Sequence, residues 1–419
     1  MVQIHKNFTD EAVKDLLKKY MSGEITAVYI QKILGIKRSR FFKLLEKYKN
    51  KPDSFSIQYH RKPVKIIDLN IEKNILKELS IEKQLIDDKN VPIRYYNYSY
   101  LKDQIFNKYK QKVSLPTIID RAKKNDFYIP RKDKKKAHDR EVLTNYAGEL
   151  IQHDSSLHLF APYSGKKWYL ITSLDDYSRY LLYAILLERE TSWTNIIALQ
   201  SVFMRFGMPM RYYVDCHSIF RFARGRDNVW QENRKVTDDV VTQWGQVLND
   251  CNVDVSFALS PQAKGKIERP YQWLQDRLVR TCVRENIKEI KSGGEILRQE
   301  LDRYNNHQVH STTGEIPQIR LQRAIKEGKS LFRPFSIKPP FESVKDIFCL
   351  RDERMVNSYR RLSFNNIEIP IHGVSISDKV EMRMIPNEKT GITEVRLWHK
   401  NKLVGLTKLK NSDLDRVHF

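Results

Sequence analysis

The sequence predicts a multidomain α+β protein with helical units in its N-terminal part, a central α/β core and a small all-β domain in its C-terminal part. Three observations predict this order. Apolar residues recur at helical spacing through residues 8–125, strand-like and helical runs alternate from residue 147 into the 280s, and strand-like runs separated by turn residues occupy 335–419. A chain of 419 residues is also too long for a single compact core.

The charge of the chain favours a polyanionic partner. The formal net charge is +23, and residues 1–140 hold 33 Lys and Arg against 17 Asp and Glu. The N-terminal third is therefore the expected main contact with nucleic acid, although a lysine-rich composition that only aids solubility is the alternative.

The cysteine pattern indicates a reducing compartment, and the hydropathy pattern argues against a membrane span. The four cysteines lie far apart and form no CxxC pair, which argues against a disulfide framework and a cysteine zinc site. No apolar run approaches the roughly 18 residues of a membrane span, and the first residues lack the layout of a signal peptide. We expect a cytoplasmic protein.

Residues 1–55 are predicted to form a helix-turn-helix DNA-binding domain. A helix capped by Thr9 ends near Gly23, and a short apolar helix then meets a turn at Gly35. The helix after this turn places basic residues on one side, as candidate DNA contacts: Lys37, Arg38, Arg40 and Lys43. The same helix is expected to pack inward through Phe42, Leu45 and Tyr48. A plain helical hairpin with a solvated basic face is the alternative.

Residues 65–130 are predicted to form a second helix-turn-helix DNA-binding domain. A helix, a turn near Val113–Ser114 and a helix starting at Pro116 follow one another, and proline is favoured early in a helix. Two such units in tandem would contact a longer DNA site than one. Residues 131–146 are charged and without periodicity, and we interpret them as a basic linker that also contacts phosphates.

Residues 147–325 are predicted to form the α/β core. Its strands and helices follow in the order β-β-β-α-β-α-β-α, which predicts a mixed central sheet. The third strand, YLLYAILLE, is continuously apolar, as buried strands are. Asp175–Asp176 is expected to form the turn after the second strand, because Asp side chains bond their own backbone two residues on.

Residues 335–419 are predicted to form a small all-β barrel. Strand-like runs alternate there with turn residues at Asn365–Asn366, Gly373 and Asn387.

Three acidic residues occupy special places in the predicted core. Asp154 lies within the first strand, Asp215 ends the fourth, and Glu268 lies near the start of the last helix. In a sheet of this order the first and fourth strands are neighbours, so the three carboxylates are expected to meet. Two like charges 4 Å apart repel by about 4 kcal/mol at an effective dielectric of 20, so such a cluster needs protons or cations. Carboxylate oxygens suit Mg²⁺ or Mn²⁺, and two such ions can stabilise both oxygens of a phosphodiester displacement.

The core resembles the catalytic domain of DDE transposases and retroviral-type integrases, which has a ribonuclease H-like fold. The resemblance spans roughly residues 145–320. Five segments carry it: ELIQHDSS, with Asp154 and Ser156; TSLDDYSRY; YYVDCHSIF, with Asp215; LSPQAKGKIERPYQWLQDRL, with Glu268; and YNNHQVHSTTGEIP. The set is specific, although each segment alone is a weak signal.

The resemblance implies that Asp154, Asp215 and Glu268 bind two Mg²⁺ or Mn²⁺ ions per active site and catalyse 3′-end cleavage and strand transfer. It also implies that Lys264, Lys266 and Arg269, beside the glutamate, hold DNA phosphates, a solvated basic helix face being the alternative. The expected protein is a bacterial insertion-sequence transposase, cytoplasmic and associated with the nucleoid. Its expected partners are double-stranded DNA, as terminal inverted repeats and as target, and further copies of itself, at least as a dimer on DNA.

Several features depart from the family pattern. The interval between Asp215 and Glu268 is longer than in retroviral integrases, and residues 216–236 are interpreted as an insertion that contacts DNA or a partner subunit. Cys216-His217 replaces the usual Asn-Gly, so His217 is either a phosphate contact or a structural residue. Two other functions stay open: a catalytically inactive DNA-binding regulator derived from a transposase, and a nuclease acting on RNA–DNA hybrids.

Overall fold

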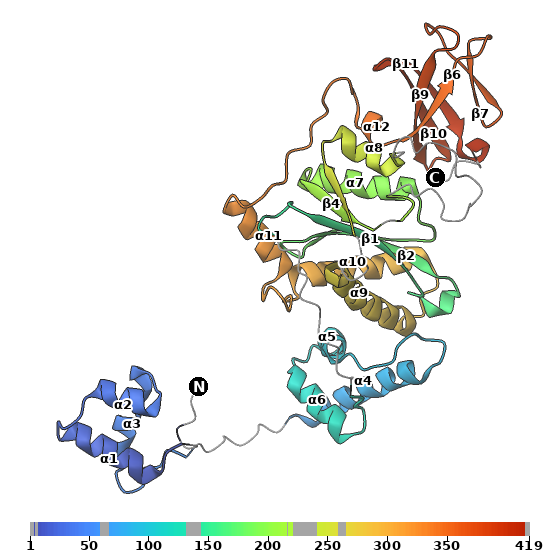
Figure 1. Ribbon diagram of the computed structural model, residues 1–419. Helices are drawn as coiled ribbons and strands as arrows, with labels where there is room; N and C mark the ends of the chain where they lie inside the picture. Colours follow the sequence, from blue (N-terminus) through green and yellow to red (C-terminus); the bar gives the residue numbers. More distant parts are fainter. Residues whose placement is uncertain are drawn as a thin grey trace, which may run out of the picture. The chain divides into compact units, whose positions relative to one another are not determined.

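The computed structural model describes residue 4 and residues 7–58, 67–130, 144–215, 217–220, 241–258 and 265–414. The chain folds into two compact units, Met1–Lys73 and Asn74–Phe419. Figure 1 shows the helices and strands of both units, coloured along the sequence. Within the described ranges no helix is long and apolar enough to cross a membrane.

The N-terminal unit is built from three helices, α1 (Asp10–Met21), α2 (Ala27–Leu34) and α3 (Arg38–Asn50). Thr9 caps α1 by accepting a hydrogen bond from the Ala12 N–H, as predicted. Gly35 ends α2 with a left-handed backbone (φ 63°), so that α3 begins three residues later. The helices share a core of buried side chains: Val13, Leu17, Ile30, Leu34, Phe41, Leu45 and Tyr48.

The prediction that Phe42 of α3 packs into the core is wrong. Phe41 is fully buried and packs edge-on against Tyr20, whereas Phe42 is 40% exposed. The reason is helical spacing, because Phe41 stands four residues before Leu45 and seven before Tyr48, on one face of the helix. Phe42 lies on the neighbouring, solvent-facing side.

The second helical segment comprises α4 (Leu69–Asp87), α5 (Tyr98–Tyr109) and α6 (Leu115–Lys124). The predicted turn and helix start are confirmed, since Ser114 caps α6 by accepting from the Thr117 N–H and Pro116 lies in its first turn. The linker prediction for 131–146 falls mainly on residues 131–143, which lie outside the described residues.

A five-stranded mixed sheet forms the centre of the larger unit. Its strands lie in the order β3-β2-β1-β4-β5. They are β1 (Ile151–His158), β2 (Trp168–Asp175), β3 (Leu181–Leu187), β4 (Arg211–Val214) and β5 (Asp254–Phe257). β1 pairs antiparallel with β2 and parallel with β4, so the predicted adjacency of the first and fourth strands is confirmed. This mixed sheet fits a ribonuclease H-like core.

Helices cover both faces of this sheet (Figure 1). On one face lie α7 (Ser192–Phe206) and α8 (Gln243–Asp250). On the other lie α9 (Gly265–Arg284) and α10 (Ile290–Asn306), and α11 (Pro317–Lys326) follows α10 along the chain. The predicted strand and helix order is confirmed for the described residues, and the predicted insertion lies largely outside them, at Cys216 and 221–240.

The C-terminal domain is all-β, but the predicted barrel is not confirmed, because the described strands do not close into one. Four antiparallel strands form a sheet in the order β11-β10-β9-β6, and β7 and β8 form a separate hairpin. The strands are β6 (Leu350–Met355), β7 (Arg361–Phe364), β8 (Ile367–Pro370), β9 (Lys379–Asn387), β10 (Ile392–His399) and β11 (Lys402–Lys410). A barrel would require β6 to pair with β11, and each of these two strands ends the sheet on its own side.

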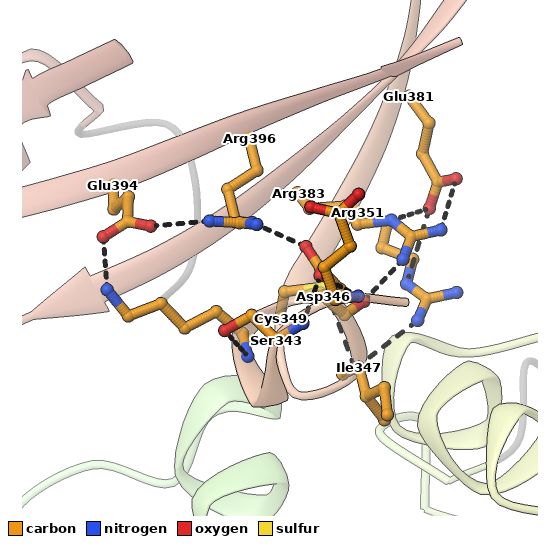
Figure 2. A network of polar contacts seen from close by, with 11 residues as sticks. Ser343, Asp346, Ile347, Cys349, Arg351, Glu381, Arg383, Glu394 and Arg396 are labelled. Atoms are coloured by element: carbon orange, nitrogen blue, oxygen red, sulfur yellow. Dashed lines mark hydrogen bonds and ion pairs between the residues drawn. The ribbon is translucent and has the colours of Figure 1, made fainter. Parts of the chain in front are cut away.

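Buried ion pairs join the short helix α12 (Val344–Ile347) to this sheet (Figure 2). Asp346 accepts from Arg396 at 2.5 Å through Oδ1, and its carbonyl oxygen accepts from Arg383 at 2.6 Å. Arg383 also pairs with Glu381 at 3.0 Å. Asp346 is fully buried, and the charge of Arg396 compensates the cost of burying its carboxylate.

Candidate catalytic site

Strand pairing brings two of the predicted acids to the same level of the sheet. The parallel register between β1 and β4 pairs Ile151 with Tyr212 and Gln152 with Tyr213. Continued by two residues, this register puts Asp154 opposite Asp215, the first residue after β4. The Asp215 carboxylate accepts a hydrogen bond of 3.0 Å from the backbone N–H of His217, so the chain beyond β4 turns back over the carboxylate.

Alternation along β1 decides which face of the sheet Asp154 occupies. His153 bonds Asn195 of α7, on one face. Ser156 accepts a 2.6 Å hydrogen bond from Gln275 of α9, on the other face. Because successive strand residues point to opposite faces, Asp154 shares the α9 face with Ser156.

Tyr271 of α9 lies where these elements meet. Its phenolic oxygen accepts a 2.9 Å hydrogen bond from Thr172, the β2 residue paired with Asp154. Burial raises the pKa of the Tyr271 hydroxyl well above its ordinary value, and the negative charges of Asp154, Glu190 and Asp215 raise it further. This hydroxyl is therefore a neutral group within electrostatic reach of both strand aspartates.

Glu268 belongs to the first turn of the same helix. Its side chain is not among those described, but its position on α9 is. Positions 268, 271 and 275 follow the i, i+3, i+7 spacing of one helical face, and Tyr271 and Gln275 both contact the sheet from this face. Pro270 stands inside α9 as its sixth residue, so the helix lacks the hydrogen bond that a backbone N–H at this position would donate to the carbonyl of residue 266.

A polar network on the opposite face holds β1 against α7. Ser155 donates to Glu190 at 2.6 Å, and Asn195 donates to the other oxygen of Glu190 at 3.2 Å. The ring of His153 joins Asn195, at 2.8 Å, to Ser173 of β2, at 2.9 Å. The strand that carries Asp154 is thus hydrogen-bonded through its side chains on both faces.

The turn after β2 is held by two buried carboxylates, as predicted for Asp175 and Asp176. Asp175 accepts from the backbone N–H groups of Gly148 and Ser178, each at 2.9 Å, and from the Ser178 hydroxyl. Burial raises the pKa of Asp175 to about 6, against the lowering effect of these hydrogen bonds. Asp176 pairs with Arg179 at 3.0 Å and accepts from Gln152 of β1 at 2.6 Å. The turn therefore supports the part of β1 that lies just before Asp154.

The fifth resembling segment also braces the core. The side-chain amide of Asn305 accepts from the Leu181 N–H at 2.9 Å and donates to the Leu181 carbonyl at 3.0 Å. Since Leu181 begins β3, this one residue fastens the end of α10 to the edge strand of the sheet. Asn305 therefore has a structural role in the core.

The end of α9 distant from Glu268 is anchored to α4 and α5 by buried charge pairs. Arg284 donates to Glu78 at 2.7 Å, and Arg280 pairs with Glu82. Arg277 donates to Asp103 of α5 at 2.8 Å. Both glutamates are fully buried. The helix that carries Glu268 is thus held along its length, by the sheet at its start and by α4 and α5 at its end.

The predicted DNA contacts fall into two groups. In the N-terminal unit, Lys37, Arg38 and Lys43 are exposed and Arg40 is half-buried, all at the start of α3. Beside Glu268, Lys266 and Arg269 lie in the first turn of α9, where side chains are not described. Lys264 lies outside the described residues.

The chemistry of the described groups fits a divalent cation with oxygen ligands. Two carboxylates, Asp154 and Asp215, come from neighbouring strands and lie close to uncharged hydroxyls. Among the side chains that the structure describes, no three of His, Cys, Asp or Glu gather closely enough to hold a metal ion, and Glu268 is not one of these side chains.

Sequence reasoning missed the groups that surround the aspartates. Tyr271, Thr172 and Glu190 carry no motif of their own. A signal existed for Tyr271, because it stands three residues after Glu268 and so shares its helical face. No such signal marks Thr172, whose role follows only from its pairing with Asp154 across β1 and β2.

Comparison with known proteins finds curated transposases that are similar to part of the chain. No protein-family model matches it. A protein of Sinorhizobium fredii named as the transposase y4bF is 29% identical over 245 residues, which cover 58% of this chain and 48% of that protein. The transposase for insertion sequence IS1202 of Streptococcus pneumoniae is 29% identical over 174 residues, which cover 41% of this chain and 36% of that protein. The chain thus spans half or less of the length of these curated relatives.

Solved structures similar to the chain include the HTLV-2 integrase catalytic core domain in complex with magnesium. That similarity has 15% identity and a TM-score of 0.31, and covers 43% of this chain and 98% of that one. The simian T-cell lymphotropic virus intasome in complex with PP2A regulatory subunit B56 gamma has 13% identity and a TM-score of 0.34, with 71% of this chain and 89% of that one covered.

Proposed function

We propose that the chain, which is similar to curated transposases, is a transposase of the DDE transposase and retroviral-type integrase family that binds the terminal inverted repeats of a mobile element, cleaves their 3′ ends and joins them to target DNA. One observation carries the proposal most strongly. Asp154 on β1 and Asp215 directly after β4 both act electrostatically on Tyr271, which stands three residues after position 268 on α9. Three carboxylates from three elements are the donor set that the chemistry requires.

Asp154, Asp215 and Glu268 would hold the divalent ions. When bound, Mg²⁺ or Mn²⁺ supplies Lewis-acid stabilisation for the attacking and leaving oxygens of the phosphodiester, with two ions per site in our proposal. Tyr271 and Thr172 would line the site with uncharged hydroxyl groups and orient the Asp154 carboxylate. Lys266 and Arg269, and Lys264 before them, would hold phosphates of the DNA end beside the reacting bond.

The N-terminal unit would bind the terminal repeat through α3. Lys37, Arg38 and Lys43 present positive charge on its exposed surface, and the glycine turn between α2 and α3 is typical of a helix-turn-helix. We propose that α4 to α6 add a second DNA contact and that two or more copies hold two ends together. A bacterial cytoplasmic location associated with the nucleoid accords with such a substrate.

The test uses Asp215→Asn, with the full chain and duplex DNA carrying the terminal repeat. The variant should bind the repeat as the unchanged protein does but lose Mg²⁺-dependent cleavage and strand transfer, because an amide is a poor ligand for the ion. Asp254→Asn is the matched control, since Asp254 lies on the adjacent strand β5 with its side chain 71% exposed and pairs only at the surface with Arg211. Full activity in Asp215→Asn would refute the site. Absence of metal-dependent cleavage in the unchanged protein, with binding intact, would favour a DNA-binding regulator.

A further inference from the structure

Helix α3 exposes an aromatic ring in the middle of its basic surface. Phe42 is 40% exposed, although Phe41 beside it is fully buried. The guanidinium of Arg38 lies 5.7 Å from the centre of the Phe42 ring, and the Phe41 ring packs edge-on against it at 5.1 Å. The ring is therefore supported from two sides and still presents apolar surface to solvent.

The surroundings of Phe42 define the kind of partner that fits. Helix α3 holds five Arg and Lys residues and one Glu, so the occupant of this surface is anionic. Ser39, Lys43 and Glu46 are exposed beside the ring. The core of the unit is complete without Phe42, because Phe41, Leu45 and Tyr48 fill the inward face of the helix. An exposed aromatic ring that the core does not use is suited to contact with a partner.

Duplex DNA is an anionic partner that offers one apolar group in the groove that a helix can enter. This group is the 5-methyl of thymine, which projects into the major groove and is contacted by small apolar and aromatic side chains. A ring placed among cations would meet this methyl group while Arg38 and Lys43 contact phosphates or bases nearby.

We propose that Phe42 packs against the 5-methyl group of a thymine in the terminal repeat and is a specificity-determining residue. The inference rests on the proposed function, in which α3 enters the major groove. Residues four apart on a helix are separated by about 6 Å along its axis, which equals about two base steps. The thymine therefore lies within about two base pairs of any base that Arg38 contacts.

The experiment replaces each thymine of the terminal repeat by uracil in turn, which removes the methyl group alone. Binding of the full chain is measured by fluorescence anisotropy of the labelled duplex at one fixed salt concentration. At one position per repeat the unchanged protein should bind about fourfold more weakly, the effect of exposing one methyl group. Phe42→Ala should bind thymine and uracil duplexes equally at that position.

Two further variants complete the design. Tyr29→Ala removes an aromatic ring from α2 that is 55% exposed, and it should keep the discrimination between thymine and uracil. Phe42→Leu retains an apolar side chain and should keep part of that discrimination, and it replaces Phe42→Ala if the alanine variant unfolds.

The outcomes separate the inference from the proposed function. If the unchanged protein binds every uracil duplex as it binds thymine, or if Phe42→Ala and Phe42→Leu keep the full discrimination, the role of Phe42 is refuted while repeat binding stands. If the unchanged protein does not prefer the terminal repeat over unrelated duplex, the proposed function itself fails and the inference fails with it.

Discussion

The hydroxyl of Thr172 donates a hydrogen bond of 2.9 Å to the phenolic oxygen of Tyr271, and this contact fastens the beginning of α9 to strand β2. Thr172 also pairs with Asp154 across the sheet. One short contact therefore links the helix that carries Glu268 to the strand residue opposite the first aspartate. The position of the helix relative to the two aspartates depends on it.

The first prediction concerns Tyr271→Phe. The change keeps the ring but leaves the buried Thr172 hydroxyl without its acceptor, so the free energy of unfolding should fall by about 1–3 kcal/mol. Strand transfer should fall by about 10- to 100-fold, the range found when groups that support metal ligands are removed. Repeat binding, measured in the same samples, should stay unchanged.

A second substitution separates the effect of this hydrogen bond on stability from the effect of Tyr271 on activity. Thr172→Val removes the donor at nearly constant volume, and in the double variant no buried polar group is left unpaired. Stability should then recover toward that of the unchanged protein, while activity stays low. Activity that recovers together with stability would indicate that Tyr271 acts on the fold alone.

The second prediction compares two neighbouring glycines of α10. A Cβ on Gly293 would lie 2.6 Å from the ring of Trp168, which is buried and cannot move aside, so Gly293→Ala should destabilise the protein by about 1–3 kcal/mol. A Cβ on Gly294 meets nothing within 4 Å, and Gly294→Ala should stabilise the helix by up to about 1 kcal/mol. Urea unfolding followed by tryptophan fluorescence measures both, because all six tryptophans belong to Asn74–Phe419. Equal effects of the two substitutions would contradict the close packing.

The local sequence pattern was enough to predict the strand order of the α/β core, but not the closure of the C-terminal sheet or the burial of each aromatic residue in α3. The adjacency of β1 and β4 follows from the order of strands and helices, and the position of Asp215 follows from the end of a short apolar run. The C-terminal barrel is not confirmed, because alternation predicts that strands form and does not say which edges pair. Phe42 was placed in the core because two adjacent aromatics fit the pattern nearly equally well, and only the i, i+4, i+7 spacing of Phe41, Leu45 and Tyr48 separates them.

The contacts of α9 with α4 and α5 lay beyond prediction for a different reason. Glu78 and Arg284 are 206 residues apart, and nothing near either residue names the other. On a helix rich in Lys and Glu, Glu78 and Glu82 are indistinguishable by sequence from solvated charges. Their complete burial can be recognised only in the folded structure, where α9 supplies Arg284 and Arg280 as their partners.

The third prediction concerns the junction between α8 and the C-terminal sheet. Gln243 donates to the Arg351 carbonyl at 2.7 Å and accepts from the Arg351 N–H at 2.6 Å, so its side chain completes the backbone hydrogen bonds of β6. Gln243→Ala should cost about 1–3 kcal/mol and expose the segment before β6 to limited proteolysis. Asn249→Ala on the same helix, whose side chain is exposed, is the control and should have little effect. Cleavage at the same rate in both variants would contradict this role of Gln243.

The fourth prediction concerns Glu78. Burial alone would raise the pKa of Glu78, but the charge of Arg284 and the hydrogen bonds from Arg284 and Lys108 hold it below its ordinary value. Because the folded pKa is depressed, the pair stabilises the fold above the unfolded pKa and loses this contribution as pH falls through the folded one. Glu78→Ala should cost about 3–5 kcal/mol at neutral pH, since it leaves the buried Arg284 with only its longer pairing to Glu82, at 3.7 Å.

The control for Glu78 is a carboxylate at the surface. Glu353 pairs with Lys379 at 2.6 Å, but both side chains are more than half exposed. Glu353→Ala should therefore change the free energy of unfolding by less than about 1 kcal/mol. A comparable loss in both variants would show that burial of the Glu78 pair is not what makes it important.

The last prediction concerns Asp175, whose contribution to the free energy of unfolding changes with pH in the opposite direction to that of Glu78. Its folded pKa of about 6 lies above the ordinary value for aspartate, because burial penalises the charged carboxylate more than its hydrogen bonds favour it. The folded state therefore binds a proton that the unfolded state has released, and this stabilisation is complete below the unfolded pKa and is lost as pH rises through the folded one. Between about pH 5 and pH 7 the unchanged protein should lose about 1 kcal/mol from this group. Asp175→Asn cannot titrate, so its urea midpoint should lack this component, and the difference in unfolding free energy between the two proteins should change by that amount across the interval. A constant difference would mean that Asp175 is ionised in the folded protein throughout, and that its three hydrogen bonds outweigh burial.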